Sequence, residues 1–210
     1  SHSHILPGVD DGIKTIEESL EVLAHFDSLG VKKVRLTPHV MNGVEHWEDV
    51  LQAFDTLRRR YTGEIALELG AEYMLDSGFQ KRLEKGVQPL YGDCMLVETS
   101  YFSPANNLDE LLYNVSLAGY TPVIAHPERY LYMRYSDYCE LKNKDCLLQL
   151  NLLSLSGYYG KQVMKKAESL LEKGMYNMVG TDLHNLETFR KWIENVRLTD
   201  KQTREIMSLR

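Results

Sequence analysis

Residues 121–126 read Thr-Pro-Val-Ile-Ala-His, a short apolar run that ends in a histidine. The run is long enough for a buried β-strand and too short for a helix. Further strand-like runs recur along the chain, at 31–37, 65–69, 94–98, 146–151 and 176–181. Short buried strands are therefore the repeated unit of this sequence.

Segments with helical spacing of apolar residues separate most of these strands. The clearest begins at the capping box Thr15-x-x-Glu18 and runs to about residue 29. The others are expected near 47–57, 80–86, 106–118, 134–143, 160–173 and 186–195. Such alternation predicts an α/β fold with a parallel sheet and helical crossovers, and periodicity alone leaves both an open sheet and a closed barrel available.

Length and composition favour one ordinary globular domain. The chain has 210 residues, 43% of them hydrophobic and 26% charged, which is enough to bury a core and far from the composition of disordered proteins. A net charge of −6 argues against nucleic acid as a partner. The three cysteines form no CxxC pair, so we expect a reducing compartment and a cytoplasmic protein. No run of about 18 apolar residues is present, so we expect no membrane insertion.

Ligand-type side chains follow nearly every predicted strand. Both architectures place functional sites at the carboxyl ends of their strands, so these side chains should meet at one edge of the sheet. The set is His39, Glu72, Glu98, His126, Asp182 and His184, joined by His2, His4, Asp10 and Asp11 near the start of the chain.

Two spacings suit metal binding. His2 and His4 alternate in an extended segment and so point the same way, and Asp182-x-His184 repeats that geometry. Imidazoles mixed with carboxylates suit Zn, Mn or Fe, and the absence of a nearby thiolate argues against a structural zinc finger. The pattern predicts a catalytic metal site.

Each of these residues also has a plainer interpretation. A single histidine at a strand end is commonly a hydrogen-bonded core residue, Asp10-Asp11-Gly12 alone is a turn, and residues 1–4 could be the remnant of a purification tag. The shared position at successive strand ends favours the metal site. His25 lies inside a predicted helix and His46 in a loop, and neither is expected to bind metal.

The motifs together resemble a known family. They are HSHILPGVDDG from residue 2, TPH at 37–39, GAE at 70–72, VET at 97–99, PVIAHPERY at 122–130 and TDLHN at 181–185. In this order, over nearly the whole chain, they resemble the polymerase and histidinol phosphatase (PHP) superfamily. Within it they are most similar to the bacterial metal-dependent protein-tyrosine phosphatases encoded with capsule and exopolysaccharide genes.

The resemblance implies a fold and a set of ligands. The fold is a distorted seven-stranded (β/α)7 TIM-like barrel, as a single PHP phosphatase domain over residues 1–210, and the site holds three divalent ions, with Mn preferred and Fe or Zn possible. The implied ligand sets are His2, His4, Glu72 and Asp182; Glu72, Glu98 and His126; and Asp11, His39 and His184. Arg129 matches the family's phosphate-binding arginine and is expected to be catalytic together with His126, and Arg190 is the candidate for a second substrate-binding arginine.

The implied activity is hydrolysis of a phosphoric monoester, phosphotyrosine, by a metal-activated water. A cysteine nucleophile is excluded because no cysteine begins a Cys-x5-Arg motif. Glu128 could donate a proton or form a structural salt bridge, and Tyr101 and Phe102 could stack on a phosphotyrosine ring or pack in the core. The implied partner is a membrane-linked tyrosine autokinase that controls polysaccharide synthesis.

Two other functions stay open at this point. A small-molecule phosphoesterase such as a histidinol-phosphate phosphatase would use the same metals. A non-catalytic partner that docks onto a kinase would use metal only to stabilise its fold.

Overall fold

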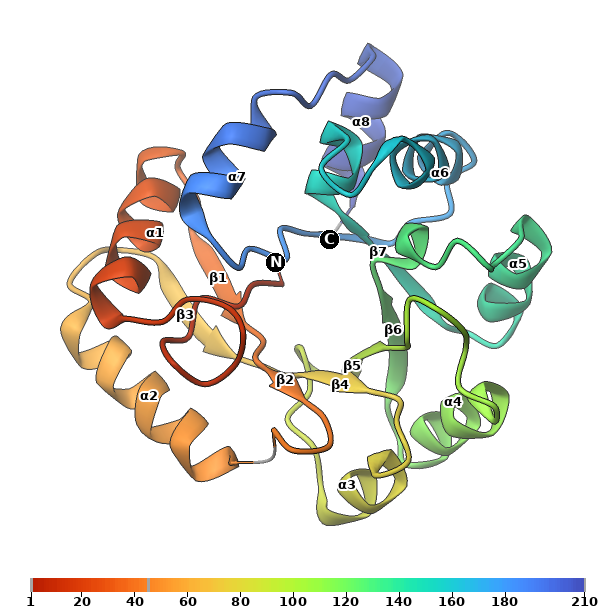
Figure 1. Ribbon diagram of the computed structural model, residues 1–210, viewed down its shortest axis with the longest axis horizontal. Helices are drawn as coiled ribbons and strands as arrows, with labels where there is room; N and C mark the ends of the chain where they lie inside the picture. Colours follow the sequence, from red (N-terminus) through yellow and green to blue (C-terminus); the bar gives the residue numbers. More distant parts are fainter. Residues whose placement is uncertain (1, 45, 210) are drawn as a thin grey trace.

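The computed structural model describes residues 2–44 and 46–209, with strands at the centre and helices around the outside (Figure 1). The strands are β1 (Lys33–Leu36), β2 (His39–Val40), β3 (Ala66–Leu69), β4 (Glu72–Met74), β5 (Cys94–Glu98), β6 (Thr121–Ala125), β7 (Leu147–Asn151) and β8 (Met178–Gly180). The helices are α1 (Ile16–Ser28), α2 (Trp47–Arg60), α3 (Phe79–Lys85), α4 (Leu108–Leu117), α5 (Tyr135–Asn143), α6 (Lys161–Glu172), α7 (Leu186–Ile193) and α8 (Asp200–Ser208), with 3-10 turns η1 (Pro127–Arg129) and η2 (Leu152–Ser156).

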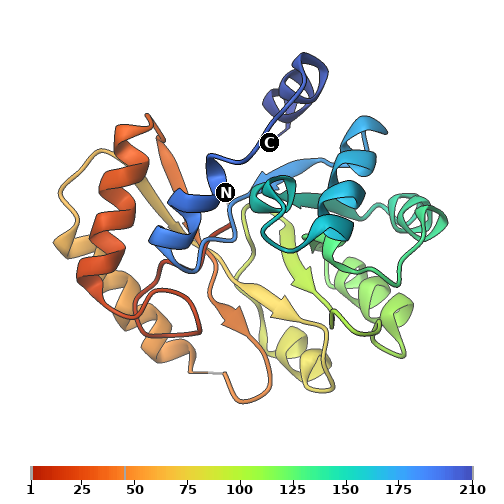
Figure 2. The same ribbon diagram turned by 45° about the horizontal axis from the view of Figure 1, so that its top comes forward.

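Every strand pair of the two sheets is parallel, as the alternating pattern predicted. The main sheet has the order β2-β4-β5-β6-β7-β8, and β1 and β3 form a separate pair. The strands curl around a common centre with their helices outside, as a second view shows (Figure 2). All five residues of β5 are buried, as are the last four of β6 and of β7, which explains their nearly continuous apolar sequences.

The seven-stranded barrel expected from the resemblance is not one continuous sheet in the part of the chain that the structure describes. β1 and β2 are separated by Thr37-Pro38, and proline has no N–H to donate to a ladder. β3 and β4 are separated at Gly70, where an added Cβ would lie 3.2 Å from the Leu90 Cα. The Gly70 N–H still donates to the Leu36 carbonyl (2.8 Å), so each pair of short strands follows one interrupted path.

The start of the chain lies between the end of β1 and the segment after β8. Ser3 forms a parallel bridge with Leu183, and the His4 N–H donates to the Leu183 carbonyl at 3.0 Å. On the other side, the Thr37 N–H donates to the Ser3 carbonyl at 2.9 Å. These bonds place His2 and His4 at the centre of the fold, where the N label lies in Figure 1.

Most predicted elements are present, with three additions. The strands at 94–98 and 121–125 have the predicted bounds, and α1 begins at the predicted Thr15–Glu18 capping box. The sequence did not predict β2, β4 or α8. Cys94, Cys139 and Cys146 form no disulfide with one another. Among the described residues, no helix is both long and apolar enough to cross a membrane.

Candidate metal centre

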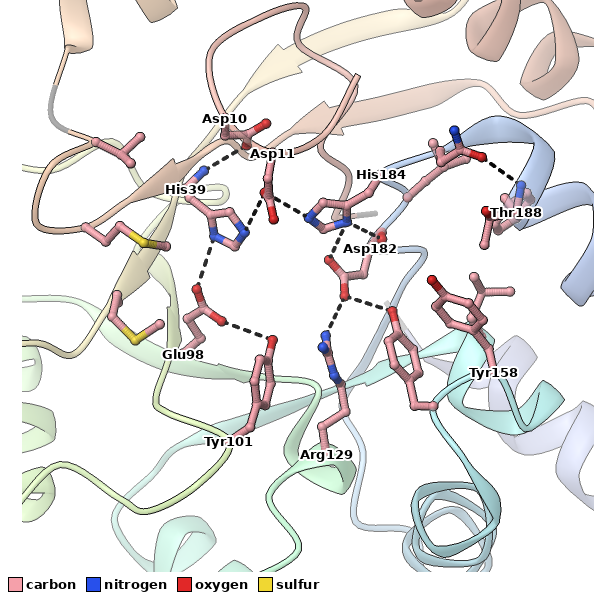
Figure 3. A pocket seen from close by; sticks show the side chains of 18 residues that line it. Asp10, Asp11, His39, Glu98, Tyr101, Arg129, Tyr158, Asp182, His184 and Thr188 are labelled. Atoms are coloured by element: carbon pink, nitrogen blue, oxygen red, sulfur yellow. Dashed lines mark hydrogen bonds and ion pairs between the residues drawn. The ribbon is translucent and has the colours of Figure 1, made fainter. Parts of the chain in front are cut away.

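Histidines and carboxylates from strand ends across the fold meet beside an open cavity of about 640 Å³. Figure 3 shows several of them pointing toward one another from β2, β5, the loop after β8 and the loop before α1. Three sets of these side chains have ligand atoms within 4.8 Å of one another and could hold metal ions. The sequence-predicted residues are therefore neighbours in space.

The first group is His2, His4, Glu72 and Asp182, all buried. The Nε2 atoms of the two histidines lie 2.9 Å apart. Glu72 Oε2 lies 3.3 and 3.2 Å from these nitrogens, and Asp182 Oδ1 lies 3.5 and 3.3 Å from them. Two imidazole nitrogens facing two carboxylate oxygens form the donor set of a divalent cation.

The second group is His39, Glu72 and Glu98. His39 Nδ1 lies 3.1 Å from both Glu72 Oε2 and Glu98 Oε1. These three atoms are buried and have no hydrogen-bond partner, an arrangement that a shared ion would satisfy. His126 adjoins this group, with Nε2 at 3.1 Å from Glu72 Oε1 and 3.7 Å from Glu98 Oε2.

The third group is His4, Asp11, His39 and His184. Asp11 Oδ1 lies 3.4 Å from Nε2 of both His39 and His184. The His184 Nδ1 lies 2.9 Å from the Asp182 carbonyl, a contact in which it donates and leaves Nε2 facing Asp11. This group is the most open of the three, since the Asp11 side chain is 73% exposed.

The groups perturb one another's protonation. Burial and the nearby His4 would lower the pKa of His39, but the Glu72 and Glu98 carboxylates outweigh them and raise it to about 10. Burial would raise the pKa of Glu72, yet His2, His126 and His39 hold it well below its usual value. The ionised Glu72 carboxylate therefore faces a His39 imidazole that holds its proton in the absence of metal, and a divalent cation would displace that proton.

Local backbone strain is concentrated at the same place. Among the described non-glycine residues, only His126 (φ 35°), Asp145 (φ 58°) and Asp182 (φ 48°) have positive φ. Two of these three follow the ends of β6 and β8 and carry ligand-type side chains. A left-handed backbone costs a non-glycine residue roughly 1 kcal/mol or more, and such strain is common at functional sites.

Two further side chains support the histidines of the first group. His4 Nδ1 lies 2.8 Å from Asp10 Oδ2, and His2 Nδ1 lies 2.8 Å from Gln149 Oε1. When each Nδ1–H donates to its oxygen, Nε2 is left free for a metal, which is the usual arrangement around ligating histidines. The candidate ligands predicted from the sequence included Asp10, whereas the structure places it against His4 and in none of the three groups. Nothing in the sequence distinguished Gln149 from other polar strand residues.

Asp182 is held from the side opposite the first group. Its Oδ1 faces the histidines, whereas Oδ2 accepts from Arg129 Nη1 (3.0 Å), from Asn151 Nδ2 (2.8 Å) and from the Tyr159 hydroxyl (3.4 Å). Asn151 ends β7, the one predicted strand to which the sequence assigned no ligand. Asn151 and Tyr159 therefore orient a candidate ligand without belonging to the candidate set.

We expect Asn151→Leu to weaken metal binding about tenfold, because loss of a residue that orients a metal ligand typically lowers affinity 10- to 100-fold. Titration of the apo protein with Mn²⁺, followed by calorimetry, measures the change. Asn195→Leu, an exposed substitution after α7, is the matched control and should leave the affinity unchanged. Equal affinities for both variants and the unmodified protein would contradict this role.

Arg129 lies at the cavity wall between two aromatic rings. Its Cζ is 4.1 Å from the Tyr101 ring centre and 4.2 Å from that of Tyr159, and Figure 3 shows Tyr101 beside it. The Tyr101 hydroxyl lies 3.5 Å from Glu98 Oε2. Cation–π contacts with two rings restrict the guanidinium and keep its charge at the cavity.

The remaining predicted residues lie elsewhere. Arg190 is on the exposed side of α7, pairs with Glu21 at 2.9 Å, and is not among the cavity-lining residues. His25 and His46 join none of the three groups. Glu128 is fully buried and does not line the cavity; it accepts from the Asn151 N–H and the Tyr176 hydroxyl and has no salt bridge to any described residue.

A parallel α/β sheet that gathers buried imidazoles and carboxylates beside a cavity, next to a confined arginine, defines a metal-dependent hydrolase. The chain belongs to the CpsB/CapC family, since residues 1–204 match the family described as "Capsular polysaccharide synthesis, CpsB/CapC". The family relationship inferred from the sequence motifs is therefore confirmed.

Named relatives agree with this assignment. The chain is 32% identical over 196 residues to tyrosine-protein phosphatase YwqE of Bacillus subtilis, covering 89% of this chain and 77% of the relative. It is also 32% identical over 203 residues to tyrosine-protein phosphatase CpsB of Streptococcus pneumoniae, covering 89% and 83%.

A solved structure matches the fold. Crystal structures described as YwqE from B. subtilis and CpsB from S. pneumoniae, "unique metal-dependent tyrosine phosphatases", include a chain with TM-score 0.82 and 28% identity. The match covers 93% of this chain and 83% of that one. The curled parallel sheet is thus the fold of these phosphatases.

Proposed function

We propose that this chain is a metal-dependent protein-tyrosine phosphatase of capsule or exopolysaccharide synthesis, a phosphoric monoester hydrolase. The observation that carries the proposal is the convergence of three His/carboxylate groups beside the cavity that Arg129 lines. Family membership and the named relatives support the substrate class.

The proposed centre holds three divalent ions. One takes His2, His4, Glu72 and Asp182; the second takes Glu72, Glu98 and His126; and the third takes Asp11, His39 and His184. The facing nitrogens of the first group support the first of these sets, and the orphaned buried oxygens Glu72 Oε2 and Glu98 Oε1 support the second. The orphaned His39 Nδ1 also lies beside these two oxygens, 3.1 Å from each. Carboxylates form nearly half of the set, which favours Mn, while Fe and Zn suit the imidazoles.

Divalent ions at such a site supply a water nucleophile at neutral pH and neutralise phosphate charge. The chain itself positions the substrate. Arg129 would bind non-bridging phosphate oxygens, held in place by Tyr101 and Tyr159. A phenolate is a tolerable leaving group, so no dedicated acid is required, and the buried, hydrogen-bonded Glu128 has no access to donate one. Arg190 is left out of the phosphate site because it pairs with Glu21.

The proposed architecture is one domain over residues 1–210, built as a distorted seven-stranded barrel. Its strands would be the segment around Ser3, β1 with β2, β3 with β4, and β5 to β8. The hydrogen bonds between Ser3 and Thr37 on one side, and from the His4 N–H to the Leu183 carbonyl on the other, support this arrangement.

The proposed physiological substrate is a phosphotyrosine protein, specifically a membrane-linked tyrosine autokinase. The family description, which names capsular polysaccharide synthesis, supports the process. A histidinol-phosphate phosphatase has no specific observation in its favour here.

Hydrolysis assays test the proposal directly. We expect release of phosphate from phosphotyrosine peptides with added Mn²⁺, loss of activity after chelation, and recovery when Mn²⁺ is restored. Phosphoserine peptides and histidinol phosphate should react at least tenfold more slowly. Faster hydrolysis of histidinol phosphate would assign the small-molecule activity, and no hydrolysis of any ester despite bound metal would favour the non-catalytic kinase partner.

A further inference from the structure

The apolar side chain of Phe102 is exposed to solvent, next in sequence to the cavity-lining Tyr101. Phe102, in the loop between β5 and α4, is 94% exposed, although the sequence allowed it to pack in the core. Leu131, in the loop after β6, is 47% exposed. β5 and β6 are neighbours in the sheet, so both loops lie on the same rim. A contiguous exposed apolar surface commonly marks an interaction site.

The exposure of Phe102 does not come from a loose loop. The Phe102 N–H donates to Ser100 Oγ at 3.2 Å, and the Ser100 carbonyl accepts from the Tyr132 hydroxyl at 3.0 Å. The latter bond ties the loop that carries Phe102 to the loop that carries Leu131. A fixed backbone therefore presents Phe102 to solvent, and little conformational entropy is lost when a partner covers it.

This rim is continuous with the cavity. Tyr101, the residue before Phe102, lines the cavity, and its ring lies 4.1 Å from the Arg129 guanidinium carbon. Figure 3 shows Tyr101 pointing toward the cavity beside Arg129 and Glu98. A phosphate bound at Arg129 would thus lie near Tyr101, and Tyr101 is the residue directly before the exposed Phe102.

A protein substrate must cross such a rim. When the phosphate of a phosphotyrosine reaches Arg129, the aromatic ring spans the cavity and the backbone of the substrate stays outside it. The residues on either side of the phosphotyrosine then lie on the rim, where an apolar residue could cover Phe102. A free phosphate ester has no such residues.

We infer that Phe102, with Leu131, forms a docking surface for an apolar residue that flanks the phosphotyrosine of a protein substrate. The inference rests on the proposed function and adds a sequence preference to it. Phe102 acts on specificity, since it is not among the cavity-lining residues and does not contact the reacting phosphate.

A comparison of two peptides and three enzymes tests the inference. The peptides have phosphotyrosine flanked by leucines or by serines, and the enzymes are the unmodified protein, Phe102→Ser and Leu117→Ser. Leu117 is the matched control, an apolar residue on α4 that is 72% exposed. We expect the unmodified protein to prefer the leucine peptide about fivefold in kcat/KM, mainly through KM, as partial burial of one apolar side chain allows.

Phe102→Ser should reduce this preference to less than about twofold, and Leu117→Ser should retain it. An equal preference in all three enzymes, or no preference in the unmodified protein, overturns the docking surface. Hydrolysis of free phosphotyrosine by the unmodified protein separates this failure from failure of the phosphatase function. If free phosphotyrosine and both peptides remain intact, the proposed function and the inference fall together.

Discussion

Replacement of Glu72 by glutamine is expected to lower kcat toward phosphotyrosine by roughly 10³-fold. Glu72 is fully buried, and its two oxygens face histidines from several parts of the chain. Oε2 lies 3.1 to 3.3 Å from nitrogens of His2, His4 and His39, and Oε1 lies 3.1 Å from His126. One carboxylate therefore links the first and second groups.

The size of the effect follows from charge. Glutamine keeps the shape of the side chain and removes the negative charge that two proposed ions would share. Metal ions supply several kcal/mol of transition-state stabilisation, and each 1.36 kcal/mol corresponds to a tenfold change in rate, so loss of about 4 kcal/mol gives roughly 10³.

Two measurements distinguish this role from simple unfolding. Metal content by mass spectrometry should fall in Glu72→Gln, while circular dichroism should still report the folded α/β protein. Glu68→Gln is the control, because Glu68 is a half-exposed carboxylate on β3 that pairs with Lys33 and Arg35. Full metal content and activity within threefold of the unmodified protein would rule out Glu72 as a bridging ligand.

The sequence was most informative about residues that would bind a metal ion directly. A ligand needs a specific side chain at the end of a strand, so His39, Glu98 and His126 could be recognised from strand pattern and residue type alone. The structure places all three at the centre. The buried strands at 94–98 and 121–125 were equally clear, because a continuous apolar run bounded by turns has few other interpretations.

Residues that only orient a ligand, by a hydrogen bond to it, could not be recognised in the same way. Gln149 and Asn151 support His2 and Asp182 across more than 30 positions of sequence. The register of β7 beside β8 brings Asn151 near Asp182, and the pairing of the first residues with the segment after β8 brings His2 to Gln149. The short strands β2 and β4 were missed because Pro38 and Gly70 interrupt the apolar pattern. Arg190 was proposed from its spacing to Asp182 but does not line the cavity. Spacing alone does not reveal which face of α7 points to the cavity.

The second large effect concerns Arg129. We expect Arg129→Met to lower kcat/KM toward phosphotyrosine by about 10²- to 10³-fold, because a guanidinium provides paired, charge-assisted hydrogen bonds to phosphate that methionine cannot form. Methionine keeps most of the apolar stem between Tyr101 and Tyr159, so the change tests charge more than packing. Arg129→Lys should recover only part of the activity, since an ammonium binds phosphate as a point charge.

Steady-state kinetics on phosphotyrosine and inhibition by inorganic phosphate measure the loss. Arg190→Met is the matched control: Arg190 is half-exposed and pairs with Glu21, so both constants should stay within about twofold of the unmodified protein. If Arg190→Met were as damaging as Arg129→Met, α7 would have to turn toward the cavity when substrate binds, and the phosphate site would need two arginines. If Arg129→Met bound inorganic phosphate as tightly as the unmodified protein, Arg129 would not bind phosphate, and its only role would be the structural contact with Asp182.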